Sequence, residues 1–336
     1  MKQTVSVGNK QIGEGAPTFI MAEAGLNHNG QLKLAKELIQ KAVEVHADAI
    51  KFQSYITEKF VNLSSPAFKL FKKYELSFQE FQELSDIAKE LGIIFLSTPL
   101  DIESADFLEK LGVQAFKVAS CDLTNLPFLE YLSKKGKPII LSTGMATLEE
   151  VAEAVDVIDT DGNQNLVLLH CVSSYPASLK DVNLRAMLTL NKRFKVPVGF
   201  SDHTSSLLTP IVAVSMGASL IEKHFTLDKT LPGPDHCCSF DIKEFSEMVN
   251  SIRLVEEMLG SSLKKPAKAE ISIRDSSRRS ITANVNIPKG TKISKNMITF
   301  KAPGNGIPPK NLMSVIGRHA KADISPDEVI KWEKIR

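Results

Sequence analysis

The chain has 336 residues, of which 41 are basic and 39 acidic, so its formal net charge is +2. This near balance produces no global basic field, which argues against nucleic acid or a membrane surface as a partner. A chain of this length accommodates one large domain together with a small one.

Targeting and cysteine signals are weak. The N-terminal sequence MKQTVSVGNKQIGEG lacks the apolar centre of a signal peptide. No stretch approaches the roughly 20 apolar residues of a membrane span. The four cysteines form neither a spaced disulfide framework nor a CxxC zinc motif. We therefore expect a protein of the reducing cytoplasm with no membrane segment.

Short apolar runs recur along the chain and are typical of strands buried on both faces. Eight such runs are present, at 19–25, 48–55, 93–99, 115–120, 138–144, 165–173, 196–203 and 219–226. Helical patterns lie between most of them or follow the last, at 31–45, 77–92, 103–112, 147–158 and 241–260. Capping boxes begin three of these helices, at Ser77/Glu80, Thr147/Glu150 and Asp241/Glu244.

The repeated strand–helix unit indicates the fold. Eight such units within about 250 residues predict a TIM (β/α)8 barrel. A doubly wound parallel sheet also alternates strands and helices, but it does not explain a count of eight. We therefore predict a barrel over residues 1–260.

Polar side chains gather at the C-terminal end of nearly every predicted strand. In a barrel these ends converge on one face, where the active site lies. A single Ser or Thr there could simply cap the next helix, but capping does not account for eight ends. The polar set is Glu23, Lys51, Gln53, Ser97, Thr98, Lys117, Ser120, Ser142, Thr143, Ser173, Ser201, His203, Glu222 and His224.

This polar set is typical of a phosphate site. Lys51 and Lys117 supply charge, and hydroxyl groups supply directed donors. The hydroxyl groups are those of Thr98, Ser120, Ser142, Ser173 and Ser201. The sequence has no P-loop and no GxGxxG after a first strand, which argues against a nucleotide.

Two histidines stand on neighbouring predicted strands. His203 and His224 could share one divalent metal, or either could be a structural histidine bonded to a carboxylate. Glu23 could be a base, a ligand through water, or a partner of Lys51. In the loop 228–240, Pro-Gly-Pro predicts a rigid turn that presents Asp235 and His236 over the barrel mouth. Asp235 could bind sugar hydroxyls or merely form the turn.

The C-terminal part of the chain differs in composition from the barrel. Residues 261–278 are polar and basic and are predicted to form a linker. Residues 279–336 contain short alternating runs split by Pro and Gly, which predicts a small β-rich module. A module of about 60 residues is small for an independent core, so we expect it to lean on a partner surface.

Several linked motifs resemble those of the bacterial sialic acid synthase family. They are AEAGLNHNG, FKVAS, GFSDHT, IEKHFTLDKTLPGPDH and the terminal IPKG…PGNGI segment. The resemblance runs from about residue 5 to the end. It implies a TIM barrel followed by an antifreeze-like (SAF) domain. It also implies condensation of phosphoenolpyruvate with N-acetylmannosamine and water to N-acetylneuraminate and phosphate. A divalent metal would be required, Mn²⁺ first, with Mg²⁺ or Co²⁺ as alternatives.

The resemblance also assigns roles to residues. It implies a homodimer in which the SAF domain of one copy covers the barrel mouth of the other. His203 and His224 would hold the metal, and Glu23 would act near the attacking water or the metal. The sugar would contact Gln53, Asp122, Tyr175 and Asp235. Phosphoenolpyruvate would contact Lys51, Thr98, Lys117, Ser120, Ser142, Ser173, Ser201 and His203.

Three positions depart from the family pattern. Asp122 stands where many bacterial members have glutamate, Ser173 where some have asparagine, and Ala302 where many have an arginine that reaches the sugar. A legionaminic acid synthase using 2,4-diacetamido-2,4,6-trideoxymannose therefore stays open. Pseudaminic acid and spore-coat polysaccharide synthases are less favoured.

Other classes of protein predict different observations. A synthase for a sugar phosphate needs a further basic site, and none is evident. A Schiff-base aldolase needs a desolvated lysine that pyruvate and borohydride would trap. A non-catalytic ice- or sugar-binding protein would release no phosphate from phosphoenolpyruvate.

Overall fold

The computed structural model describes residue 1 and residues 3–336. Residue 2, within the N-terminal stretch considered for a signal peptide, lies outside the described residues. The chain divides into two compact units, Met1–Gly260 and Ser261–Arg336. Among the described helices, none combines the length and the apolar character needed to cross a membrane.

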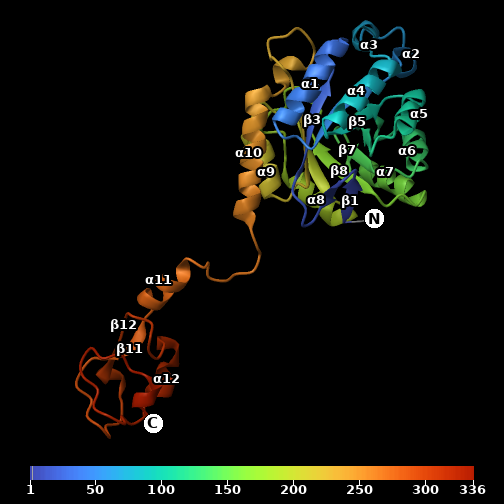
Figure 1. The fold of residues 1–336 in the computed structure, drawn as a ribbon. Helices are drawn as coiled ribbons and strands as arrows, with labels where there is room; N and C mark the ends of the chain where they lie inside the picture. Colours follow the sequence, from blue (N-terminus) through green and yellow to red (C-terminus); the bar gives the residue numbers. More distant parts are fainter. Residues whose placement is uncertain (2) are drawn as a thin grey trace. The chain divides into compact units, whose positions relative to one another are not determined.

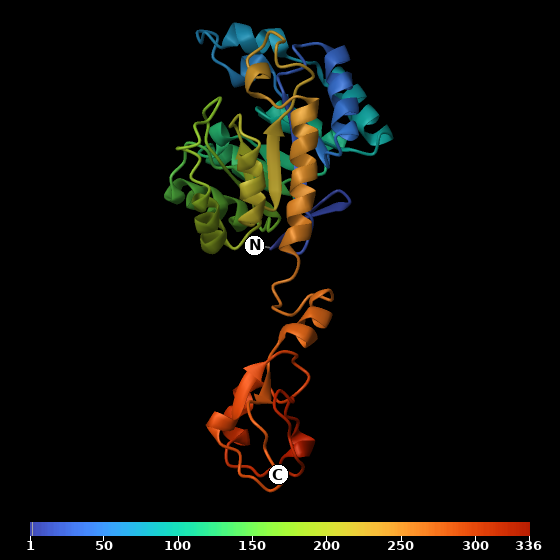
Figure 2. The same cartoon turned by 90° about the vertical axis from the view of Figure 1, so that its left-hand side faces the viewer.

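The first unit is built on a parallel eight-stranded sheet that curls into a nearly closed barrel (Figures 1 and 2). The strand order is β5-β4-β3-β10-β9-β8-β7-β6, and the two end strands β5 and β6 are neighbours in space. Each predicted apolar run contains one strand, so the barrel is confirmed and the doubly wound alternative is wrong. The strands are β3 (Phe19–Gly25), β4 (Ala49–Ser54), β5 (Ile94–Pro99), β6 (Phe116–Val118), β7 (Ile139–Ser142), β8 (Leu166–Cys171), β9 (Val198–Asp202) and β10 (Leu220–His224).

Helices surround the barrel (Figure 1). The five predicted helices are α1 (Leu32–Glu44), α4 (Phe78–Glu90), α5 (Ile102–Leu111), α7 (Leu148–Thr160) and α10 (Ile242–Leu259). Reciprocal side-chain bonds form all three predicted capping boxes, at the starts of α4, α7 and α10. The sequence did not predict α6 (Leu126–Ser133), α8 (Arg185–Phe194) or α9 (Leu208–Ser215).

An unpredicted hairpin closes the N-terminal end of the barrel. Strands β1 (Thr4–Val7) and β2 (Lys10–Gly13) pair antiparallel. Their side chains Val5, Val7 and Ile12 join a buried apolar cluster formed by inward-facing strand residues such as Phe19 and Met21. Apolar packing therefore fills this end of the interior, and the polar strand ends lie at the other.

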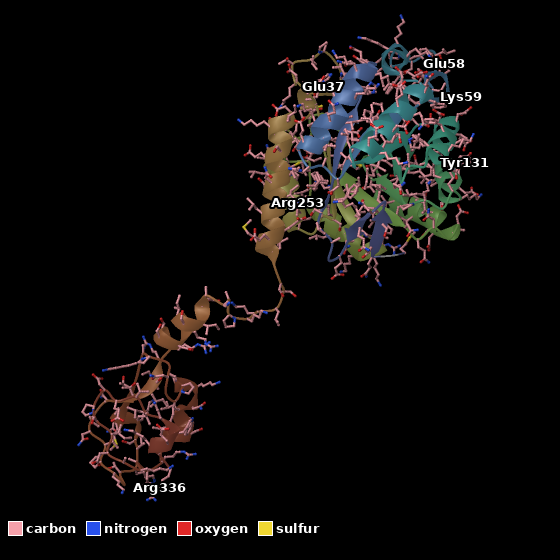
Figure 3. The ribbon with its side chains drawn as sticks, viewed as in Figure 1. Glu37, Glu58, Lys59, Tyr131, Arg253 and Arg336 are labelled. Atoms are coloured by element: carbon pink, nitrogen blue, oxygen red, sulfur yellow. The ribbon has the colours of Figure 1, made fainter. Side chains whose placement is uncertain are left out.

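Arg253 connects the last helix to the beginning of the barrel. This residue, labelled on α10 in Figure 3, donates from its guanidinium to the carbonyl of Thr18 at 2.9 Å. It also contacts the Asp48 carboxylate at 3.3 Å, and Asp48 accepts from the Ile20 amide at 2.8 Å. These contacts link α10 to the segments that begin β3 and β4.

Three segments cover the C-terminal end of the barrel. They are α2 (Thr57–Phe60), α3 (Phe68–Tyr74) and the loop after β10, which contains the 3-10 helix η2 (His236–Cys238). In both views they lie at the end of the first unit opposite the β1–β2 hairpin (Figures 1 and 2).

The second unit is small and rich in isoleucine. Its antiparallel strands β11 (Ser280–Ala283) and β12 (Ile298–Lys301) fit the predicted β-rich module. Its core consists of Ile281, Ala283, Ile287, Ile293, Ile298, Ile307, Val315, Ala320, Ile324, Ile330 and Ile335. Its helical elements are α11 (Glu270–Ser277), η3 (Lys295–Met297), η4 (Pro309–Asn311), α12 (Leu312–Val315) and η5 (Trp332–Lys334).

Candidate active site

A cavity of about 380 Å³ opens at the C-terminal end of the barrel. Side chains two residues apart on a strand face the same way, so pairs such as Ser201/His203 and Glu222/His224 point inward together. The cavity lining includes all but two of the predicted site residues: Glu23, Lys51, Gln53, Thr98, Lys117, Ser120, Ser142, Ser173, Tyr175, Ser201, His203 and His224.

Four buried charged side chains form the floor of the cavity. The Lys51 ammonium lies 2.5 Å from Glu23 Oε2 and 3.1 Å from Glu222 Oε1. The Lys117 ammonium lies 3.4 Å from Glu222 Oε2. Each lysine also donates to one hydroxyl, Lys51 to Thr98 at 3.1 Å and Lys117 to Ser142 at 2.7 Å. The two predicted phosphate-binding lysines are thus brought together by a shared glutamate.

The two carboxyl groups of this cluster differ in pKa. Burial raises the pKa of Glu23 to about 7, although Lys51 acts in the opposite direction. Burial would also raise the pKa of Glu222, but Lys117 and Lys51 outweigh it and lower that pKa to about 2. Burial lowers the pKa of Lys117, which Glu222 only partly opposes. Glu222 is therefore a fixed anion, whereas Glu23 exchanges a proton near neutral pH.

Hydroxyl groups line the cavity beside Lys117. Ser120 Oγ accepts from the Gly144 amide at 3.0 Å and lies 3.1 Å from Cys171 Sγ. A Cβ atom added to Gly144 would lie 2.8 Å from both Ser120 Oγ and Cys171 Sγ, and closer still to Ser173 Oγ. The missing side chain of Gly144 leaves room at the centre of a ring of donors, as a phosphate requires.

The two predicted metal ligands face one cavity. The imidazole centroids of His203 and His224 are 5.6 Å apart, and the ring of Tyr175 lies 4.3 Å from that of His203. His203 Nδ1 donates to the Val172 carbonyl at 2.9 Å, which leaves the lone pair on Nε2. His224 Nδ1 is buried and has no hydrogen-bond partner among the described residues.

These imidazoles fit a divalent metal. Burial, and to a smaller extent His224, lowers the pKa of His203 to about 4. Burial also lowers the pKa of His224, so both rings are neutral at pH 7, as metal ligation requires. The described residues contain no cluster of three or more His, Cys, Asp or Glu side chains that could hold a metal. The protein would therefore contribute two imidazoles, and water or substrate oxygens would complete the coordination.

Two predicted sugar ligands lie outside the cavity lining. Asp122, in the 3-10 helix η1 (Ser120–Asp122), accepts from the Asn125 side chain at 3.1 Å. Asp235 Oδ2 accepts from the Leu26 amide at 3.2 Å. Gly25 has a φ of 49° and no side chain. The space that a Cβ atom would fill there is bordered by Asp235, Glu23 and His224, so Asp235 comes close to the other two. Asp235 therefore lies beside the cavity, whereas the Asp122 carboxylate is hydrogen-bonded to a residue three positions along the chain.

The loop prediction for His236 is wrong. Its side chain is 1% exposed, and Nδ1 lies 2.7 Å from the Thr226 hydroxyl. The ring therefore supports the loop from below and does not project over the mouth. All four cysteines are free among the described residues.

Sequence reasoning missed two parts of the site. Glu222 was noted at a strand end but was given no role, although it bridges both lysines. Its sequence signal is its spacing of two from His224. Apolar lining by Phe60, Phe71 and Leu100 was also missed. Phe60 and Phe71 lie on helices α2 and α3, so a search of the C-terminal ends of strands could not identify them.

Comparison with known proteins places this geometry among sugar-acid synthases. Residues 38–264 match the NeuB family, and residues 278–336 match the SAF domain. An uncharacterized protein of Methanocaldococcus jannaschii is 51% identical over 99% of both chains. The N,N'-diacetyllegionaminic acid synthase of Legionella pneumophila is 45% identical, over 98% of this chain and 97% of its own length.

A solved structure supports the same grouping. The N-acetylneuraminic acid synthetase of Leptospira borgpetersenii, in complex with citrate, is 38% identical with a TM-score of 0.78. The match covers 81% of this chain and 95% of that one.

Proposed function

The chain belongs to the NeuB family, and from this premise we propose that it joins phosphoenolpyruvate to the open-chain aldehyde of an N-acetylated aminohexose. The products are a nine-carbon 2-keto sugar acid and phosphate. One observation carries the proposal. A cluster of two lysines with hydroxyl groups and a pair of neutral imidazoles share one cavity.

The lysine cluster suits an anionic substrate. When Glu23 is protonated, two ammonium groups face the single carboxylate of Glu222, which leaves net positive charge. Ser142 and Ser120 add directed donors beside Lys117. In this proposal Lys51, Lys117 and the hydroxyls hold the phosphate throughout the reaction, so that much of their contribution is positioning.

His203 and His224 would hold a divalent metal, Mn²⁺ being the first candidate. When bound, such an ion supplies a Lewis acid that polarises the aldehyde. The hydrogen bond from His203 Nδ1 to the Val172 carbonyl fixes the tautomer and the orientation of the ring. Groups that hydrogen-bond a metal-ligating histidine usually have this role.

His224→Ala tests this assignment. We expect Mn²⁺ affinity to fall more than about 100-fold, because even loss of an outer partner typically lowers affinity 10- to 100-fold. Electron paramagnetic resonance of free Mn²⁺ measures the affinity without turnover. His170→Gln is the matched control, since His170 is buried on β8 and bonds the Val182 carbonyl at 2.7 Å. Unchanged affinity in His224→Ala would remove it as a ligand.

The reaction balances as follows. C3 of phosphoenolpyruvate bonds to the aldehyde carbon, and the aldehyde oxygen takes a proton from the protonated Glu23 carboxyl group, which becomes a carboxylate. The positive charge that develops at C2 is met by a water molecule, which gives one proton to the Glu23 carboxylate. The C–O bond to phosphate then breaks, phosphate leaves with the bonding electron pair and takes the remaining proton of the C2 hydroxyl, and C2 becomes the keto carbon. A group with a pKa of about 7 can accept and return this proton.

Solvent oxygen-18 tests the order of bond breaking. Because water adds to C2 and the C–O bond breaks, label should enter the keto acid and not the phosphate. Label in the phosphate would contradict C–O cleavage. Trapping of a pyruvate adduct by borohydride would instead favour the Schiff-base class.

The cavity favours an unphosphorylated sugar. Among the described residues Lys51 and Lys117 are the only basic side chains other than histidine in the lining. Both are needed for phosphoenolpyruvate, so a second phosphate would find no cation. N-acetylmannosamine is the first candidate substrate, which would make the product N-acetylneuraminate. The similarity to the Legionella enzyme favours a second candidate, 2,4-diacetamido-2,4,6-trideoxymannose.

We also propose a homodimer in which the second unit of one copy covers the barrel mouth of the other. Met145 and Tyr175 line the cavity and are 72% and 53% exposed, so such a cover would bury apolar surface.

The deciding experiment for function combines the protein, Mn²⁺, phosphoenolpyruvate and a panel of acetylated aminohexoses. Phosphate release and product mass identify the substrate, and no release with any sugar would refute the proposal.

A further inference from the structure

One side of the cavity is an apolar wall, formed by Phe60, Phe71, Leu100 and Ala119. Leu100 and Ala119 follow Thr98 and Lys117 by two residues. Strands β5 and β6 end just before these two residues, so Leu100 and Ala119 lie nearer the mouth than Thr98 and Lys117. The wall is therefore placed beside the part of the cavity beyond the phosphate.

Aromatic contacts hold the wall together. The Phe60 and Phe71 rings meet edge to face with centroids 5.0 Å apart. Tyr55 packs behind them, 5.4 Å from Phe71, and its hydroxyl donates to the Phe71 carbonyl at 3.1 Å. The only polar atom of this aromatic group is thus already used, and the wall itself offers carbon atoms.

Polar contacts outside the cavity fix the segment that carries the wall. Glu75 Oε2 accepts from the Thr57 amide at 3.0 Å, which ties the start of α2 to the end of α3. Lys72 contacts Glu58 at 3.0 Å, and Lys59 contacts Glu103 on α5 at 3.1 Å. Glu58 and Lys59 are labelled in Figure 3, at the end of the barrel that carries α2. The partly buried bond between Glu75 and Thr57 thus ties together the two helices that carry the wall, and the exposed ion pairs add little.

We propose that Phe60 and Phe71, with Leu100, determine which aldose is used, by accepting a methyl group of the sugar. This inference rests on the proposed function. A hydroxyl placed against these residues would lose its bonds to water and gain none, whereas a methyl group gains burial. The methyl group is either C6 of a 6-deoxy sugar or the end of an N-acetyl group.

The preference has an expected size. An apolar pocket that accepts a methyl group discriminates against an added hydroxyl, or a missing methyl, by about 10- to 200-fold in kcat/KM. We therefore expect one of two losses. Either N-acetylmannosamine is used about 100-fold less well than its 6-deoxy analogue, or N-formylmannosamine is used about 100-fold less well than N-acetylmannosamine. The first loss identifies C6 as the group against the wall, and the second identifies the acetyl methyl.

Variants of the wall provide the test, with full-length protein, Mn²⁺ and phosphoenolpyruvate. Phe71→Ala should reduce the kcat/KM ratio between preferred and disfavoured sugars at least tenfold, and Phe71→Leu less. Phe107→Ala is the matched control, because Phe107 stacks on Phe78 with centroids 4.3 Å apart and does not line the cavity. The control should lose thermal stability and leave the ratio unchanged.

Two results would overturn the inference while leaving the proposed function intact. One is wild-type kcat/KM values within threefold of each other for all three sugars. The other is a ratio that Phe71→Ala and Phe71→Leu, both folded by thermal melting, leave unchanged. Phosphate release with none of the sugars would overturn the proposed function itself, and the two failures are therefore distinct.

Discussion

Glu222 stands between the two lysines that the sequence assigned to phosphate. Burial without a counter-charge would favour release of the ammonium proton, and the resulting neutral amine would bind an anion poorly. By contacting both Lys51 and Lys117, one carboxylate keeps two cations in the same small volume. Glu222 is thus a positioning residue for the two lysines that are proposed to bind phosphate.

The pH dependence of stability follows from this contact. The pKa of Glu222 is about 2 in the folded chain, against an ordinary 4.5. Because the folded pKa is the lower one, the stabilisation is present above pH 4.5 and is lost as the pH falls toward 2. A difference of this size corresponds to about 3 kcal/mol. Urea unfolding in chelator should show the advantage of wild type over Glu222→Gln shrinking between pH 5 and pH 3.

The matched control for this prediction is Glu83→Gln. Glu83 pairs with Lys36 at 2.9 Å, but both side chains are partly exposed. An exposed pair contributes less than about 1 kcal/mol, so its effect should stay small at every pH. An advantage of wild type over Glu222→Gln that grew as the pH fell would contradict the assignment.

Gly144 provides a second test at the scale of one residue. In Gly144→Ala the new methyl group would press on Ser120, Cys171 and Ser173 in the proposed phosphate site. Displacements of about 1 Å can cost 100-fold, so KM for phosphoenolpyruvate should rise roughly 10- to 100-fold. Gly162→Ala is the control, because its Cβ would meet nothing within 4 Å although its φ is 80°. Steady-state kinetics should show a raised KM only in Gly144→Ala; equal KM values would count against the site.

Residue-scale prediction from the sequence succeeded where strand parity applies. Lys51, Lys117, Ser142 and His224 line the cavity because strand ends of a barrel converge. The same parity placed Glu222 in the polar set, but it was assigned no role because a glutamate before a lysine and a histidine resembles an ordinary charged segment. Asp122 does not line the cavity, because in η1 its side chain accepts a hydrogen bond from Asn125, and its contact with the sugar stays a prediction.

At the scale of elements, long amphipathic helices and apolar strands were predictable and short elements were not. Helix α9 reads LTPIVAVS, whose β-branched residues and proline favour a strand or turn over a helix. Strands β1 and β2 have four residues each, too few for a clear alternation. Tertiary packing, which the local pattern does not contain, determines such elements.

A buried ion pair joins β9 and β10 on their outer face. Lys223 and Asp202 are register partners, and their side chains are 2.8 Å apart with 0% exposure. Lys223 also donates to the Thr204 carbonyl and lies over the Phe240 ring at 4.1 Å. These contacts fix the ends of the two strands that carry the imidazoles proposed to bind a metal.

Lys223→Met should destabilise the barrel by about 3–5 kcal/mol, because it leaves the Asp202 carboxylate buried and unpaired. Lys229→Met, which breaks the partly exposed pair with Glu244, should lose less than about 1 kcal/mol. Urea unfolding measures both. The double variant Lys223→Met/Asp202→Leu should recover much of the loss, since no lone charge remains. If both single variants lost the same free energy of unfolding, burial of the Lys223–Asp202 pair would not increase its contribution to stability.

At the scale of the whole molecule, composition predicted the division of the chain better than local pattern did. The division falls between Gly260 and Ser261, where the predicted linker begins. Within the predicted linker, residues 270–277 form helix α11, which the sequence indicated only weakly. A polar helix with no buried residue leaves little periodic signal.

The stretch 261–268 is readily accessible to a protease. Its residues are exposed and contain no helix or strand. Exposed, polar segments of this kind are preferred sites of cleavage. Trypsin should therefore cut first after Lys264 or Lys268, since Lys265 precedes Pro266. Intact-mass measurement should find one fragment for each unit, and first cuts inside the barrel would contradict the division.

The cut protein tests the proposed homodimer. In the proposed homodimer the tether would hold the second unit near a partner barrel at an effective concentration in the millimolar range. Once the tether is cut, assembly depends on the concentration of the fragments. Phosphate release per barrel should then fall as the cut protein is diluted from micromolar to nanomolar, whereas uncut protein should fall less. Full activity of the cut protein at every dilution would mean that the second unit plays no part in the working site.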